Sequence, residues 1–107
     1  MPKNPITVLV HYRAKPKMEK VTKKELASLI ASVVSESACI GINLHQDPAD
    51  STRFMLYENW SDKDFYLGEH MQTPYIRKFI ERAADFLIAP PEIAFWNLLD
   101  EVDNSDG

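Results

Sequence analysis

The chain has 107 residues, of which 45% are apolar, so it is long enough for one compact core and too short for two. Its 12 basic and 16 acidic residues are spread along the chain and give a net charge of −4, without a basic stripe for phosphates, which disfavours nucleic acid as a partner. The longest apolar run near the amino terminus, residues 6–10, is shorter than a membrane span or the core of a secretory signal, so we expect no membrane association and a cytoplasmic location.

The first half of the chain predicts a strand, a long helix and a hairpin. Residues 6–12 alternate between two faces and are rich in β-branched side chains, as is typical of a strand. Between about 18 and 36, apolar residues recur at steps of three and four, which predicts an amphipathic helix. Alternation returns over 39–46 and 54–60, and the polar segment between them predicts a turn that joins two strands.

The second half predicts two further helices. The hydroxyl of Ser61 can accept a hydrogen bond from the backbone N–H near Asp64, so we expect Ser61 to cap a short helix that ends near Met71. Thr73 and Pro74 are typical of the N-cap and the first position of another helix, where the missing N–H of proline costs nothing. Apolar residues at helical steps follow this cap, so a second, amphipathic helix is expected there.

Residues 93–99 predict the last strand, which completes a single domain over residues 1–99, and the acidic segment 100–107 is expected to be a flexible tail. The order strand, helix, strand, strand, helix pair, strand is that of a split βαβ unit. The sequence therefore predicts an α+β, ferredoxin-like fold with a four-stranded antiparallel sheet and helices on one face.

Both faces of this predicted sheet are largely apolar. One face carries Leu9, Met55, Tyr57, Ala94, Trp96 and Leu98, and the other carries Val8, Val10, Leu56, Phe95 and Leu99. Because helices cover only one face, a monomer would expose a large apolar patch on the other. A second copy of the chain is the simplest cover, since twofold symmetry is the commonest closed arrangement, and we therefore expect a homodimer.

Two segments carry a resemblance to a known family. The Tyr-Glu-x-Trp segment at 57–60 and the His-x-x-Thr-Pro-Tyr segment at 70–75 resemble those of the antibiotic biosynthesis monooxygenase family. The resemblance covers roughly residues 6–99. It implies a dimer whose two sheets pack face to face into a β-barrel, with a pocket in each subunit between its sheet and its helices.

The resemblance also implies a range of activities. The family includes cofactor-independent monooxygenases of polycyclic phenols and quinols, haem-degrading enzymes, and an isomerase of a signal molecule. The haem-degrading branch uses an Asn on the first strand, a Trp near the end of the short helix and a later His; this chain lacks the Asn and has His70 and Ile80 at about the other two positions. Haem degradation is therefore disfavoured, and residues 70–75 are more similar to the small quinol-monooxygenase and signal-isomerase branches.

His70 is the expected catalytic residue. It ends the predicted short helix, so its imidazole can point into a pocket between the helices and the sheet, and a histidine exchanges a proton near neutral pH. A monooxygenase without metal or flavin needs a base to form an electron-rich phenolate, and a dry site where the carbanion reduces oxygen directly. The alternative is a histidine that ends a helix and fixes a loop by hydrogen bonds.

The expected substrate-binding residues are mostly aromatic. They are Tyr75, Phe65, Tyr66, Phe79, Trp60 and Asn43. Packing in the core explains Phe65 and Phe79 equally well, and Trp60 could simply fill the core where the short helix begins. Glu58 shares a strand face with Trp60, and a buried carboxylate is costly without a partner, so we expect it to accept a hydrogen bond from Arg13 or from an indole N–H.

No metal and no other cofactor is expected. His11, His45 and Asn43 lie on neighbouring strands but lack a carboxylate as third ligand, and the single cysteine, Cys39, has no partner. The chain has no Gly-rich phosphate loop, nucleophile elbow or His-Glu-x-x-His pair. Three functions remain open: a cofactor-independent oxygenase of a small or polycyclic phenol or quinol, an isomerase of a small hydroxy-ketone signal, and a non-catalytic dimeric domain that binds a small aromatic metabolite.

Overall fold

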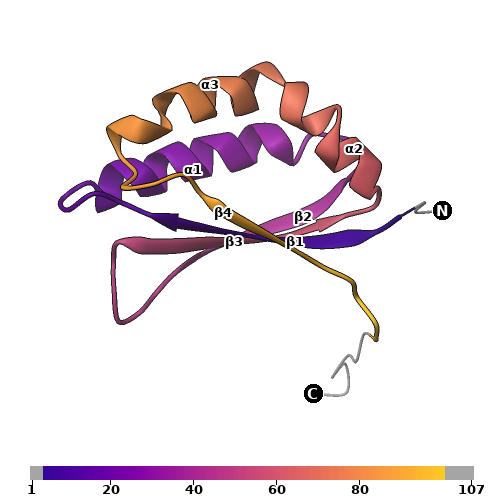
Figure 1. Ribbon diagram of the computed structural model, residues 1–107, viewed down its shortest axis with the longest axis horizontal. Coiled ribbons are helices and arrows are strands. Elements are labelled where there is room, and N and C mark those ends of the chain that lie inside the picture. Colours follow the sequence, from indigo (N-terminus) through magenta and orange to yellow (C-terminus); the bar gives the residue numbers. More distant parts are fainter. Residues whose placement is uncertain (1–3, 101–107) are drawn as a thin grey trace.

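A four-stranded antiparallel sheet forms the base of the molecule, and all helices lie on one side of it (Figure 1). The computed structural model describes residues 4–100. The strands are β1 (Ile6–Arg13), β2 (Cys39–Gln46), β3 (Arg53–Trp60) and β4 (Glu92–Trp96). Their order across the sheet is β2-β3-β1-β4, so the first strand is central and pairs with both β3 and β4. The predicted α+β, ferredoxin-like fold is confirmed.

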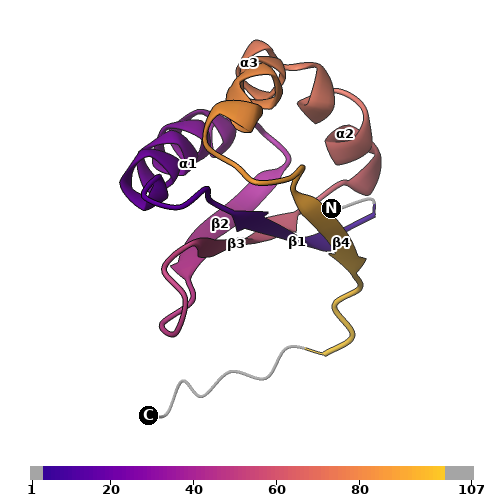
Figure 2. The ribbon, with the colours of Figure 1, turned by 60° about the vertical axis from the view of Figure 1, so that its left-hand side comes forward.

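The helical layer covers the sheet with two long and several short segments. These are α1 (Glu19–Val33), α2 (Lys63–Leu67), the 3-10 turn η1 (His70–Gln72), α3 (Pro74–Arg82) and the 3-10 turn η2 (Ala83–Asp85). Helices α1 and α3 contact each other above the sheet (Figure 2). Four side chains of α1 at steps of four, three and four are buried, namely Thr22, Leu26, Leu29 and Val33. The helical spacing of apolar residues in the sequence therefore identifies the face of α1 that packs on the strands.

The start of α2 differs from the prediction by one residue. Asp62 is the N-cap, and its Oδ1 accepts hydrogen bonds from the backbone N–H groups of Asp64 at 3.0 Å and Phe65 at 3.4 Å. Ser61, which we expected to be the cap, instead donates its hydroxyl to the carbonyl of Ala38 at 3.3 Å. The predicted cap was wrong because Asp62 already has the extended backbone of an N-cap and a carboxylate that accepts more strongly.

The short helix also ends earlier than expected, and a separate turn carries His70. Helix α2 stops at Leu67, and η1 begins at His70. Thr73 and Pro74 occupy the N-cap and the first position of α3, as predicted. The Thr73 hydroxyl, however, donates to the carbonyl of His70 at 2.8 Å and makes no side-chain cap of its own helix. This bond ties the turn that carries His70 to the start of α3.

Strand β4 is shorter than predicted, because pairing with β1 ends at Trp96, opposite Thr7. Leu98 and Leu99 follow it without a strand partner and are exposed. Of the tail expected over 100–107, only Asp100 lies within the described residues. None of the helices formed by residues 4–100 is both long enough and apolar enough to cross a membrane.

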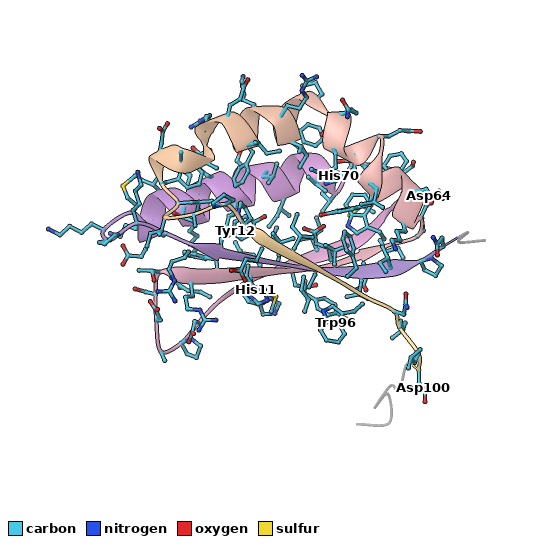
Figure 3. The ribbon with its side chains drawn as sticks, viewed as in Figure 1. His11, Tyr12, Asp64, His70, Trp96 and Asp100 are labelled. Atoms are coloured by element: carbon cyan, nitrogen blue, oxygen red, sulfur yellow. The ribbon has the colours of Figure 1, made fainter. Side chains whose placement is uncertain are left out.

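The two faces of the sheet differ in what covers them. On the helix side, Val8, Val10 and Leu56 are buried in the core. The opposite face, which we call the open face, carries Leu9, Met55, Tyr57, Ala94 and Trp96. Figure 3 shows Tyr12 and His70 between the sheet and the helices, and His11 and Trp96 on the far side of the sheet. The same face also carries polar residues such as His11 and Asn43. Trp96 is 58% exposed and Tyr57 is 38% exposed, so the large apolar side chains on this face are uncovered in the single chain.

Candidate functional site

A cavity of about 460 Å³ lies between the helix side of the sheet and the helical layer. Most of its wall is aliphatic and comes from β1, α1, α3 and the segment 87–93. The titratable groups on the wall are Tyr12, Glu58, Tyr66 and His70. A mostly apolar hollow with a few polar groups at fixed positions is the usual form of a small-molecule site.

His70 is held at this wall by the carboxylate of Glu36. Its Nδ1 lies 3.0 Å from Oε1 and 2.9 Å from Oε2 of Glu36, and the side chains of both residues are buried. Glu36 follows the end of α1, where its backbone N–H donates to the carbonyl of Val33. Because ionised carboxylate oxygens only accept hydrogen bonds, Nδ1 must carry the hydrogen. In the neutral ring Nε2 therefore carries a free lone pair, and it has no hydrogen-bond partner among residues 4–100.

Aromatic rings fix the plane of the imidazole. The ring of Tyr66 stacks on that of His70 with centroids 4.8 Å apart, and the indole of Trp60 lies 4.6 Å from it. Trp60 is completely buried and in turn stacks on Phe65. Phe65 and Trp60 do not line the cavity. Trp60 packs against the ring of His70, and Phe65 packs against Trp60.

Tyr75 contacts Glu36 and does not line the cavity. Its hydroxyl donates to Oε2 of Glu36 at 2.5 Å. Burial, together with this bond to Glu36 and the charge of Glu36, raises the pKa of Tyr75 to about 12, so the phenol keeps its proton near neutral pH. Tyr75 therefore helps to orient the carboxylate that orients His70.

Glu58 is the carboxylate on the cavity wall. It lies on β3 and is 5% exposed, and its Oε1 accepts a hydrogen bond from Nε1 of Trp60 at 2.8 Å. The predicted indole partner is confirmed, whereas Arg13 pairs with Asp50 at 3.7 Å instead. Burial raises the pKa of Glu58 to about 7, against the opposing effect of the indole bond, and the charge of Glu36 raises it further. Glu58 can therefore exchange a proton near neutral pH.

The structure brings only part of the predicted site together. His70, Tyr66 and Phe79 line the cavity, and Phe79 also packs edge-on against Tyr12 with ring centroids 6.1 Å apart. Asn43 is exposed on the open face, opposite Tyr57, because strand alternation turns it away from the helices. This position separates Asn43 from the cavity.

Two residues of this candidate site were not predicted from the sequence. Glu36 contacts His70 across 34 positions, and no local pattern marks it. Tyr12 could have been found, because the alternation of the first strand places it on the same face as Val8 and Val10. Burial, and then the charge of Glu58, raises its pKa well above the usual range, so its phenol stays neutral.

The histidines outside the cavity lie elsewhere. His11 and His45 are exposed on the open face, on either side of Met55. Within the described part of the chain, no group of three or more His, Cys, Asp or Glu side chains is arranged to hold a metal ion.

Fold and site together define a small α+β domain with an apolar cavity and a histidine that a buried carboxylate orients. The model of the antibiotic biosynthesis monooxygenase family matches residues 5–82. The chain belongs to this family.

Individual proteins are also similar to this chain. The uncharacterized protein sll1783 of Synechocystis is 28% identical over 95 residues, which cover 89% of this chain and 64% of that protein, so the chain spans less than two thirds of its length. The crystal structure of PA3566 from Pseudomonas aeruginosa is 28% identical, with a TM-score of 0.84 over 94% of this chain and 99% of that one. Rv0793 from Mycobacterium tuberculosis, 19% identical, has the same fold, with a TM-score of 0.82 over 94% of this chain and 100% of that one.

Proposed function

We propose that the protein is a cofactor-independent monooxygenase that oxidises a phenol or quinol held in the cavity, with Nε2 of His70 as the base. The observation that carries the proposal is the buried pair of Glu36 and His70 at the wall of an apolar cavity. A carboxylate on one ring nitrogen raises the basicity of the other and stabilises the imidazolium that forms when it takes a proton. The aromatic supports of His70 keep the ring in this orientation.

The chemistry can be written for naphthalene-1,4-diol. His70 removes a hydroxyl proton, and the resulting anion transfers electron density to molecular oxygen, so that a bond forms between a ring carbon and oxygen. The hydroperoxide then loses water. The balance is one diol and one O₂ to one 2-hydroxy-1,4-naphthoquinone and one water, and the diol supplies all four electrons. The aliphatic wall suits this step because it keeps water away from the anion and admits an apolar gas.

Oxygen uptake with naphthalene-1,4-diol tests this proposal, after subtraction of the autoxidation measured without protein. We expect His70→Gln to lower the enzymatic rate by about 100-fold or more, the usual contribution of a positioned base. His45→Gln is the matched control, because His45 is exposed on the open face, and its rate should stay unchanged. An unchanged rate in His70→Gln, or no uptake above background with the native chain, would contradict the proposal. Binding of the diol without turnover would favour a metabolite-binding domain instead.

A second candidate, an isomerase of a small hydroxy-ketone, is favoured by a specific observation. Glu58 and His70 line the same cavity, and burial brings the pKa of Glu58 to about 7, so two groups can exchange protons with one ligand. Such a reaction needs no oxygen. Exchange of the hydrogens next to the carbonyl of 3-hydroxy-2-butanone, followed by NMR in D₂O under nitrogen, separates it from the oxygenase, which gives no exchange under these conditions.

We also propose that the open face is covered by a second copy of the chain, so that two sheets close into a barrel. Support comes from the apolar side chains on that face, among them the exposed Trp96 and Tyr57. The resemblance noted in the sequence implies the same arrangement.

A further inference from the structure

Glu58 has one carboxylate oxygen in use and one free. Oε1 accepts from the indole of Trp60, and Oε2 has no hydrogen-bond partner among residues 4–100. Among the described residues, Thr22 Oγ1 is the only side-chain oxygen or nitrogen that is both fully buried and without a hydrogen-bond partner, so Oε2 of Glu58 is not sealed off. Glu58 also lines the cavity. Oε2 is therefore available to a ligand.

A purely structural role does not account for this carboxylate. None of the ion pairs of the described residues involves Glu58, and a buried carboxylate without a cation lowers the stability of the fold. The titratable groups that interact with it are Tyr12 from β1, Cys39 from β2, Tyr66 from α2 and Glu36 beyond the end of α1, and none of them is a cation. A glutamine would satisfy the indole of Trp60 equally well and would cost less.

Glu58 and His70 are close enough to contact one ligand. The indole of Trp60 connects them, since its Nε1 lies 2.8 Å from Oε1 of Glu58 and its ring centroid lies 4.6 Å from that of His70. Both residues line the same cavity. We propose that Glu58 binds the second oxygen of the substrate, so that the site selects aromatic diols over aromatic mono-ols. This inference rests on the proposed function, in which His70 takes the proton of the first oxygen.

The test compares the affinities of naphthalene-1,4-diol and 1-naphthol, measured by titration under nitrogen. The native chain should bind the diol about tenfold more tightly, the contribution of one additional hydrogen bond to a charged or buried group. Glu58→Met, which keeps the length of the side chain without its oxygens, should abolish this preference and leave the affinity for 1-naphthol almost unchanged. Glu58→Gln, which can still bond to Trp60 and to a hydroxyl, should keep most of it. An unchanged preference in Glu58→Met overturns the inference.

A second measurement covers the case in which Glu58→Met does not fold. In the native chain the ratio of the two affinities should increase as the pH rises from 5.5 to 8.5, because an ionised carboxylate accepts a stronger hydrogen bond than the neutral acid. Tyr12, Tyr66 and Cys39 keep their protons over this range, because burial raises the pKa of each. Any effect of His70 falls on the hydroxyl that both ligands carry and cancels in the ratio. In Glu58→Gln the ratio should be constant, and a ratio that changes equally in both proteins overturns the inference.

The two proposals fail in different ways. A diol preference that depends on Glu58 without any oxygen uptake contradicts the oxygenase and leaves the diol site intact. Oxygen uptake that depends on His70, with a diol preference that does not depend on Glu58, contradicts only the role of Glu58.

Discussion

Glu36 decides which nitrogen of His70 is free to accept a proton. With Nδ1 committed to the carboxylate, only Nε2 can act as a base toward the cavity. Tyr75 donates a further hydrogen bond to this carboxylate, at the same Oε2 that His70 contacts. Tyr75, Glu36 and His70 are therefore linked by hydrogen bonds in this order, and of the three only His70 lines the cavity.

Substitution of Glu36 should show this dependence. In Glu36→Gln the side chain can offer its amide N–H groups to Nδ1, which stabilises the wrong tautomer, and we expect the rate of oxygen uptake to fall about 100-fold. Tyr75→Phe removes one hydrogen bond to Glu36 and leaves its charge, so its rate should fall only severalfold. If circular dichroism shows that both variants are folded and their rates fall equally, the greater importance of Glu36 over Tyr75 is contradicted.

Glu58 should make the stability of the protein depend on pH. Its pKa is about 7 in the fold, against an ordinary value of 4.5. Between these values the folded chain keeps a proton that the unfolded chain has lost, so the stabilisation present below pH 4.5 disappears as the pH rises to 7, by up to about 3 kcal/mol. Urea unfolding at pH 5 and pH 7.5 should show this loss in the native chain and a smaller one in Glu58→Gln. A larger dependence in Glu58→Gln would exclude Glu58 as its source.

At the scale of elements, the short helix α2 matters because it carries Tyr66, whose ring stacks on His70. A helix of five residues has little stability of its own, so its N-cap bonds are a large part of what forms it. Asp62→Ala should lower the free energy of unfolding by about 1 kcal/mol, as measured by urea unfolding. Ser61→Ala, the adjacent control, should lower it by less than half as much. The opposite ranking would restore Ser61 as the cap.

The sequence was sufficient for the elements whose periodicity is local. The strands alternate and α1 has apolar steps of three and four, so their positions follow from the chain alone. The end of β4 could not be predicted, because it depends on where the partner strand β1 stops. The cap of α2 was missed because Ser61 and Asp62 are adjacent and both are good caps, and only the backbone conformation selects one.

The site was predictable only where a motif marked it. His70 was predicted from its segment at 70–75, and strand alternation placed Glu58 on the same face as Trp60. Glu36 was not found, because its contact with His70 depends on how the end of α1 lies against η1. Asn43 was predicted to bind the substrate. Strand alternation alone, however, places it on the opposite side of the sheet from Ile42 and Leu44, which pack against the core.

For the whole molecule, the proposed dimer depends on the open face. Light scattering at micromolar concentration should give a mass of about twice 12.3 kDa. Leu9→Arg places a charge at the centre of that face, opposite Tyr57 and Ala94, and should give a single subunit. Val21→Arg replaces an exposed apolar residue of α1 and should leave the mass unchanged. A native chain with the mass of one subunit would contradict the dimer.

In the proposed dimer, strand β4 would have a different neighbour on each of its surfaces. Ile93 belongs to the cavity wall, whereas Ala94 and Trp96 point to the other side of the sheet. One layer of backbone would then separate a molecule bound in the cavity from the second subunit. Any displacement of this strand by a ligand would reach the subunit boundary directly, and by thermodynamic reciprocity tighter pairing of subunits would change the affinity for the ligand by the same factor.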